Sequence, residues 1–267
     1  MYNFIAKLLN FIESSTDHTK SEIIIAEFIL RNVDRIPDMS IYQLAEACHT
    51  SPATITRFCK KFENITFKEL KEYARNYIEF NYTEVDFEKL ESKINIDQIE
   101  QYYDELQMSL QETKELFQSK TILEVVHRIH VAQKVAFFGV TFSHVLSRNA
   151  QFKFMRLGKY TSAYSNHENQ ITEASKLSSK DLAVVFSFSG ETRFIRNLVK
   201  VLTEKNIPIV AITGEQQSFL AEKAEKVLLV SKRKMQTYKS PIIEEVNMLS
   251  VLNSIYLVYS YYLNSFK

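Results

Sequence analysis

The chain has 267 residues, and at about 150 residues per domain this length predicts two domains. Its 33 Lys and Arg residues against 32 Asp and Glu residues give a formal net charge of +1, so binding to a nucleic acid would need a local basic patch. The two cysteines have no companion pair at metal-ligand spacing, which argues against a disulfide framework and a zinc site. We expect no metal and no cofactor.

The N-terminal stretch is amphipathic and contains acids, unlike the basic and apolar blocks of a signal peptide. No stretch of the chain approaches the roughly eighteen uninterrupted apolar residues of a membrane span. These two features predict a cytoplasmic protein without a membrane segment.

The first half of the chain has the periodicity of helices and contains no glycine before Gly139. The expected helices lie at 21–33, 40–48, 51–62, 66–80 and 97–117. The second half alternates short β-rich runs with amphipathic segments of helix length, which is typical of a parallel sheet covered by helices. The expected strands lie at 134–140, 160–165, 182–188, 208–214 and 226–231, followed by an apolar helix at 246–263.

This order of elements predicts an all-α N-terminal helix-turn-helix domain followed by an α/β domain with a five-stranded parallel sheet flanked by helices. The composition becomes polar and acidic from about Asn81 to Asp97, which places the domain boundary in that region. We therefore expect the first domain at 1–80, a linker at 81–105 and the second domain at 106–267.

Two short helices joined by a tight turn are predicted between Ser40 and Phe62. Ser40 and Ser51 are suitable N-caps, and Pro52 stands at the first helical position, where its missing N–H costs nothing. This spacing is typical of a helix-turn-helix, whose second helix enters the major groove of DNA. Along that second helix, helical periodicity predicts a buried stripe of Ile55, Phe58, Cys59 and Phe62.

The opposite face of the second helix carries basic and hydroxyl side chains and no acid. Small residues at its N-terminal end permit a close approach to DNA, threonines reach bases or phosphates, and the cations neutralise phosphate. The candidate DNA-contacting residues are Ser51, Ala53, Thr54, Thr56, Arg57, Lys60 and Lys61. A solvated surface helix has the same pattern, so the pattern alone leaves both interpretations open.

The segment LAEACHTSPATITRFCKKFENITFKELK, which begins at Leu44, resembles the N-terminal domain of the RpiR family of bacterial transcriptional regulators. The resemblance extends over most of residues 1–80 and implies a domain that binds an operator in double-stranded DNA. His49 stands where that family often has a turn glycine. Because histidine is among the residues enriched in the left-handed conformation, we expect the turn to be retained.

Two predicted strands of the second half end in glycine and hydroxyl residues just before a helix begins. These residues are Ser187, Ser189, Gly190 and Thr192 in one loop and Gly139, Thr141 and Ser143 in the other. Ligands of open parallel sheets bind beyond the carboxyl ends of the strands, where the next helix offers unpaired N–H groups to an anion. Each loop alone is equally well explained as ordinary turn and capping chemistry.

Together the two loops resemble the sugar isomerase (SIS) domain over roughly residues 106–250, and the RpiR family joins that domain to its helix-turn-helix. The phosphate loop of that domain is matched here by SFSGET, which begins at Ser187. The resemblance implies a phosphorylated sugar as ligand, a structural role for Gly190, and Glu191 either near the sugar hydroxyls or capping the helix that follows the loop. The phosphate-binding positions that it implies are Ser143, Ser187, Ser189 and Thr192.

An aldose–ketose isomerase would need a base beside the reacting sugar carbons and a group that assists ring opening. The available side chains are His167, Glu191, Lys239, Glu244 and Glu245, and none lies in a motif for that chemistry. His167 is equally well explained as a solvated loop histidine. Where the family often carries a serine–arginine pair near the C-terminus, this chain has Lys239, Ser240 and Pro241.

We therefore expect a transcriptional regulator of carbohydrate metabolism, and not an enzyme, whose operator affinity is controlled by a phosphorylated sugar. The alternative is a sugar-phosphate isomerase with a helical N-terminal extension. A helix-turn-helix normally meets a palindromic operator as a dimer, and the helix at 246–263 is strongly apolar. The expected partners are operator DNA, the sugar phosphate and further copies of the chain in a homodimer or tetramer.

Overall fold

The computed structural model describes residues 3–13, 15, 20–63, 65–81, 97–117, 119–235 and 241–264. The chain divides into two compact units, Met1–Glu84 and Val85–Lys267. This division falls in the polar region where the sequence places the boundary, and the bounds 1–80, 81–105 and 106–267 remain a prediction. Most of the predicted linker, residues 82–96, lies outside the described residues.

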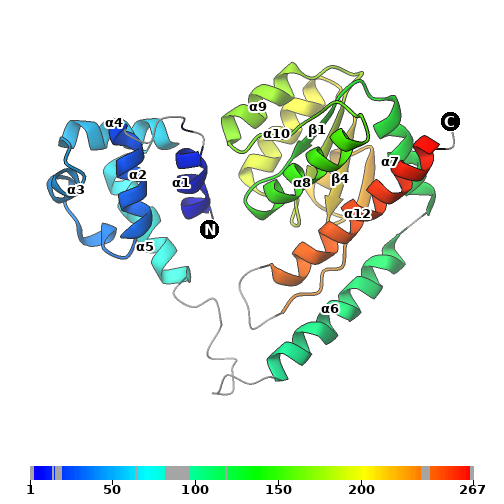
Figure 1. The fold of residues 1–267 in the computed structure, drawn as a ribbon, viewed down its shortest axis with the longest axis horizontal. Helices are drawn as coiled ribbons and strands as arrows, with labels where there is room; N and C mark the ends of the chain where they lie inside the picture. The colour runs from blue at the N-terminus through cyan, green and yellow to red at the C-terminus, as the bar shows by residue number, and fades with distance from the viewer. Residues whose placement is uncertain are drawn as a thin grey trace. The chain divides into compact units, whose positions relative to one another are not determined.

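All the secondary-structure elements that the structure describes in the N-terminal unit are helices (Figure 1). Its elements are α1 (Asn3–Glu13), α2 (Ser21–Arg31), the 3-10 helix η1 (Ile36–Asp38), α3 (Ile41–Ala47), α4 (Pro52–Glu63) and α5 (Phe67–Asn81). The helices α3 and α4 form the predicted helix-turn-helix. Ser40 caps α3 through a capping box with Gln43, and Ser51 Oγ accepts a hydrogen bond of 3.2 Å from the N–H of Thr54 at the start of α4.

The turn between α3 and α4 contains His49 with a φ of 50°, in the left-handed region. Histidine therefore occupies the position of the expected turn glycine without loss of the turn. The predicted stripe on α4 is confirmed, since Ile55, Phe58 and Cys59 are fully buried and Phe62 is nearly so. Burial raises the pKa of the Cys59 thiol to about 11, which makes it a core side chain with little thiolate at neutral pH.

The second unit is an α/β domain with a parallel sheet in the strand order β2-β1-β3-β4-β5. The strands are β1 (Val135–Phe138), β2 (Thr161–Ser162), β3 (Leu182–Phe186), β4 (Ile209–Thr213) and β5 (Lys226–Leu229). The helices are α6 (Asp97–Leu116), α7 (Ser119–Val131), α8 (Phe142–Arg156), α9 (His167–Lys176), α10 (Arg193–Glu204), α11 (Phe219–Lys223) and α12 (Ile242–Asn264). The predicted fold class is confirmed.

Helices cover both faces of this sheet, as a parallel sheet with fully buried strands requires. The core on one face joins α7, α8 and α12 to alternate strand residues such as Phe137 and Val184. The core on the other face joins α9, α10 and α11 to the intervening residues, such as Phe138 and Val185. Alternation along the strands thus divides the apolar side chains between two cores.

Helix α6 packs along α12 (Figure 1) and is held there by a buried polar cluster. Asn247 of α12 is fully buried, donates to Ser109 Oγ at 3.1 Å and accepts from Thr113 Oγ1 at 2.8 Å. Arg233, which follows β5, forms ion pairs with Glu105 and Glu112 of α6. No helix among the described residues is both long enough and apolar enough to span a membrane.

Candidate functional site

The strands β1 and β3 are neighbours in the sheet, with Phe138 paired to Val185. The chain leaves β1 toward β2 on one side and returns to β3 on the other side. Such a point of reversal is where open α/β sheets bind their ligands, beyond the carboxyl ends of the strands. Both loops that the sequence singles out begin at this point.

The loop after β3 presents three hydroxyl groups at the start of α10. Ser187 is buried and its Oγ accepts a hydrogen bond of 3.2 Å from the N–H of Gly190. Ser189 is exposed, and its Oγ accepts a hydrogen bond of 3.4 Å from the N–H of Glu191. Thr192 is the N-cap of α10 and accepts from the N–H of Ile195 at 3.4 Å. Because each hydroxyl oxygen is used as an acceptor, each O–H proton remains available to an anion.

Gly190 has no room for a side chain. Its φ is 65°, in the region that favours glycine, and a Cβ atom there would lie 2.3 Å from Ser218 Oγ. Ser218 is the buried N-cap of α11. The hydroxyl loop therefore packs directly against the start of α11, which agrees with the structural role that the resemblance implies.

Glu191 is held at the loop by two partners and acts as a cap. Its carboxylate accepts a hydrogen bond from the N–H of Phe219, the first residue of α11, and forms an ion pair of 2.6 Å with Arg196. The hydrogen bond from Phe219 and that from Arg196 lower the pKa of the carboxyl group. Glu191 therefore caps α11 and not α10, the helix that follows the loop, whose N-cap is Thr192. A place for Glu191 near the sugar hydroxyls stays a prediction.

The loop after β1 is tightly packed at Gly139 and strained at Thr141. A Cβ atom on Gly139 would lie 2.4 Å from the carbonyl oxygen of Ser143. Thr141 has a φ of 52° and a ψ of −122°, which is rare for a β-branched residue and is the kind of strain that clusters at ligand sites. Ser143 is largely buried, but its hydroxyl still reaches solvent and has no hydrogen-bond partner among the described residues.

Two residues that the sequence analysis did not single out support this loop. Gln170 of α9 is fully buried. Its side-chain oxygen accepts a hydrogen bond from the N–H of Gly139 at 3.3 Å, and its side-chain nitrogen donates one to the carbonyl oxygen of Gly139 at 2.9 Å. His144 lies beside Ser143, and its Nε2 is the one buried side-chain nitrogen or oxygen without a hydrogen-bond partner in the described part of the chain. Burial, followed by the positive charge of Arg148, lowers the pKa of His144.

The side chains that an isomerase would use lie in different environments. His167 is the first residue of α9 and stacks on Phe194 of α10, with ring centroids 4.1 Å apart, so it is not a solvated loop histidine. Glu244 lies at the start of α12 and is buried, and burial raises its pKa. Lys239 and Ser240 lie outside the described residues.

The candidate DNA-contacting residues lie at the outer face of α4. Six of the seven candidates are exposed there or immediately before the helix, and Thr54 is half-buried. Arg57 donates to Thr54 Oγ1 at 3.2 Å, which extends the guanidinium along the helix toward its N-terminal end. Lys61 forms an ion pair with Glu22 of α2, so an acid from another helix reaches a face that the α4 sequence leaves free of acids.

The comparisons with known proteins match both units. The SIS domain matches residues 128–263, and the helix-turn-helix domain of the rpiR family matches residues 6–78. The HTH-type transcriptional regulator HexR of Pseudomonas aeruginosa is 28% identical over 208 residues, which cover 78% of this chain and 73% of the relative.

Two solved structures share the fold. The Vibrio vulnificus NanR protein complexed with ManNAc-6P has a TM-score of 0.57 and 21% sequence identity, and the match covers 96% of this chain and 91% of that chain. The phosphoheptose isomerase GmhA from Neisseria gonorrhoeae has a TM-score of 0.51 and 13% sequence identity, and the match covers 61% of this chain and 98% of that chain.

The fold and its two matched domains define a DNA-binding transcriptional regulator that carries a sugar isomerase domain. The chain belongs to the RpiR family of helix-turn-helix transcriptional regulators.

Proposed function

We propose that this regulator binds its operator through α4 and binds a phosphorylated sugar at the carboxyl ends of β1 and β3, and that the sugar phosphate changes its affinity for DNA. The observation that carries the proposal is the set of three hydroxyls at the start of α10, each with its O–H proton free. The operator lies on the chromosome, so the proposal includes a cytoplasmic location.

The chemistry of the loops favours a phosphate group. The N–H groups of Arg193 and Phe194, the first two residues of α10, have no acceptor among the described residues, whereas those of the next two are bonded by Thr192. The helix dipole also favours negative charge at this end. Hydroxyls from Ser187, Ser189 and Thr192 add donors on one side, and the unpartnered hydroxyl of Ser143 adds one from the neighbouring loop. The related NanR protein was solved with the phosphorylated sugar ManNAc-6P, which supports the same ligand class here.

The operator contact follows from the exposed face of α4. Ala53 near its N-terminus permits a close approach to base edges, and Arg57 in the middle of the helix is placed to contact a base. Lys60 is exposed near the C-terminal end of α4 and reaches phosphate. Lys61 contributes less, because Glu22 already compensates its charge.

Coupling between the two sites is limited by thermodynamics. A ligand shifts an equilibrium only by its difference in affinity for the two arrangements, typically about 1–3 kcal/mol. We infer that the sugar phosphate changes how two sensor units pair, and through this the spacing of two recognition helices. A partial switch of about five- to 150-fold in operator affinity is expected.

Catalysis is not part of the proposal, although sugar-phosphate isomerases share the fold. Curated relatives such as HexR are named as transcriptional regulators. The carboxylate of Glu191 is engaged by Phe219 and Arg196, which leaves it poorly suited to abstract a proton. Conversion of an aldose phosphate to its ketose by the purified protein would support the isomerase alternative instead.

The decisive experiment measures operator affinity by fluorescence anisotropy with and without each member of a panel of sugar phosphates. The DNA is taken from upstream of the protein's own gene and its neighbours. In Ser189→Ala the response to the active sugar phosphate is expected to weaken by about tenfold in effector concentration, because one hydrogen bond to a charged group is lost, about 1.5 kcal/mol. Basal DNA binding is expected to stay unchanged, since Ser189 is exposed and lies outside the core.

Ser179→Ala is the matched control, because Ser179 is an exposed serine just before β3, at the opposite end of the same strand. It is expected to respond as the wild type does. A full response in Ser189→Ala would mean that the hydroxyl loop is only a helix cap.

A further inference from the structure

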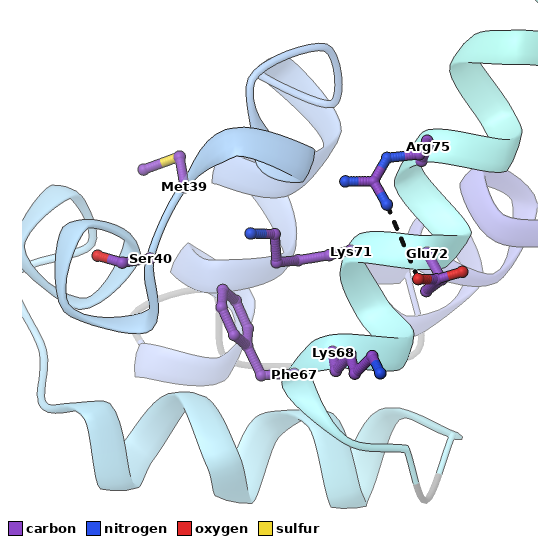
Figure 2. A pocket seen from close by; sticks show the side chains of 7 residues that line it. All are labelled: Met39, Ser40, Phe67, Lys68, Lys71, Glu72 and Arg75. Atoms are coloured by element: carbon purple, nitrogen blue, oxygen red, sulfur yellow. Dashed lines mark ion pairs between the residues drawn. The ribbon is translucent and has the colours of Figure 1, made fainter.

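A groove of about 390 Å³ lies in the N-terminal unit between the segment that opens α3 and the first turns of α5 (Figure 2). It is lined by Met39, Ser40, Phe67, Lys68, Lys71, Glu72 and Arg75. The predicted DNA-contacting residues all come from α4 and the serine before it. The groove is therefore a second feature of this unit that the operator contact described above does not use.

The charge of the groove is mainly positive. Lys68, Lys71 and Arg75 recur at helical spacing along one side of α5, whereas Glu72 is the one acid in the lining. Glu72 lies 3.7 Å from Arg75 and compensates it in part. In Figure 2 the side chains of Lys71 and Arg75 extend from α5 toward the segment that carries Met39 and Ser40. Three cations against one carboxylate suit a polyanion.

The groove also has apolar walls. Phe67 and Met39 are half-buried and pack against the core of the unit, and Figure 2 shows the Phe67 ring beneath the Lys71 side chain. A small inorganic anion has no apolar surface that could pack against such a wall. A nucleic-acid backbone presents both kinds of surface, with phosphate oxygens for the cations and deoxyribose carbons for the aromatic ring.

The position of the groove points to the same occupant. Ser40 is the N-cap of α3, which is the first helix of the helix-turn-helix. In this motif the first helix crosses the DNA backbone while the second lies in the major groove. A backbone strand that passes the start of α3 therefore reaches the groove between α3 and α5.

We propose that Lys71 and Arg75, assisted by Lys68, bind the sugar-phosphate backbone of the operator in this groove, as a sequence-independent clamp beside the major-groove contact of α4. This inference rests on the proposed function, since it requires that the protein binds DNA. It assigns to α5 the neutralisation of phosphates that α4 does not reach.

The test measures the salt dependence of DNA binding in the full-length protein. Lys71→Gln and Arg75→Gln each remove one charge while keeping a long polar side chain. Each loss of a phosphate contact is expected to reduce the slope of log K against log salt by about 0.9, which at about 0.1 M salt is an eightfold loss of affinity. The loss is expected to be equal for the operator and for an unrelated duplex, because phosphate contacts carry no base information.

Glu72→Gln is expected to change the affinity for DNA in the opposite direction. Removing the carboxylate frees Arg75 and raises the local positive charge, so affinity for both duplexes is expected to rise. A variant that merely damages the fold does not bind DNA more tightly. Arg31→Gln is the control, because Arg31 is an exposed cation of the same unit on α2, outside the groove, and is expected to leave the slope unchanged.

The outcomes separate the two proposals. Unchanged slopes in Lys71→Gln and Arg75→Gln, with a reduced slope in Lys60→Ala, would overturn the clamp and leave the α4 contact intact. A loss confined to the operator would also overturn it, since that indicates base contact. If the wild type binds no DNA at any salt concentration, the proposed function itself fails.

Discussion

His144 combines a buried nitrogen without a partner and a position next to the proposed phosphate site. A buried polar atom that makes no hydrogen bond costs about 1–3 kcal/mol, so the surrounding structure must compensate it. Burial and the charge of Arg148 lower its pKa from the usual 6.5, which favours the neutral form of the ring.

The pH dependence of stability is expected to reveal this residue. Because the pKa of His144 is lower in the folded state than in the unfolded state, the unfolded chain binds the proton more readily, and stability decreases as the pH falls below about 6.5. In His144→Phe this part of the decrease is expected to disappear. The measurement is the thermal midpoint of each protein at pH 7.5 and pH 5.5.

The same variant is expected to be as stable as the wild type or more stable at pH 7.5, since the unpartnered nitrogen is removed. His49→Asn is a suitable comparison, because His49 is exposed and asparagine also accepts the left-handed conformation. An identical decrease in stability on acidification in His144→Phe and wild type would contradict the assignment.

At the scale of helices and strands, the buried polar cluster between α6 and α12 is an unusual means of packing. Most helices of this unit pack through aliphatic side chains, whereas Asn247, Ser109 and Thr113 form a chain of hydrogen bonds with almost no exposure. Thr113 Oγ1 also accepts from the N–H of Ser231, just after β5. Such a cluster fixes the register of α6 because its hydrogen bonds are satisfied at one position only.

Asn247→Leu is expected to lower the free energy of unfolding by about 1–3 kcal/mol. Leucine has nearly the same volume, but it leaves the Thr113 hydroxyl without its acceptor and Ser109 without its donor. Urea unfolding of the full chain measures the change. Ser260→Ala on the same helix removes an exposed hydroxyl and is expected to stay within about 0.5 kcal/mol of wild type. Equal stability of both variants would show that the cluster contributes no net stabilisation.

Local patterns predicted the elements well because their causes are local. The apolar stripe of α4 follows from helical periodicity, and the caps Ser40 and Ser51 follow from the chemistry of the first turn. The hydroxyls after β3 are recognisable because they end an apolar run. Their role as phosphate ligands remains a prediction.

Contacts between distant segments were not predictable in the same way. Gln170 bonds both backbone groups of Gly139, and Lys61 pairs with Glu22, although each pair is separated by more than thirty residues. Nothing in the sequence near Gln170 distinguishes a buried amide from a solvated one. Such roles depend on how helices pack against the sheet, which no periodicity encodes.

For the whole molecule, exposed apolar side chains on two helices lead us to predict that copies of the chain associate. Tyr261 and Leu257 of α12 are 74% and 55% exposed, and Tyr103 and Ile99 of α6 are 63% and 58% exposed. Pairs four residues apart lie on one side of a helix, so each helix offers an apolar strip that the described residues leave exposed. A second copy of the chain is the expected partner, because a helix-turn-helix meets a palindrome as a dimer.

Light scattering at micromolar concentration is expected to give a mass of about 62 kDa, twice the 31.2 kDa of one chain, or a multiple of it. Tyr261→Glu and Leu257→Glu together are expected to shift the protein toward the single-chain mass, since a charge cannot be buried there without cost. A wild-type mass of 31.2 kDa would contradict the expected dimer.

The basic stretch that contains both α4 and the groove of α5 has a consequence for how fast DNA is found. Between Arg57 and Arg75 the chain has six cations and three acids, whereas the rest of residues 1–84 has four cations and nine acids. DNA therefore attracts one part of this unit and repels the remainder. A protein molecule that diffuses toward a duplex is rotated by this electrostatic field before it contacts the DNA. The search for the operator then begins with encounters in which the basic part of the unit already faces the DNA. The association rate is expected to increase most at low salt, where screening is weakest.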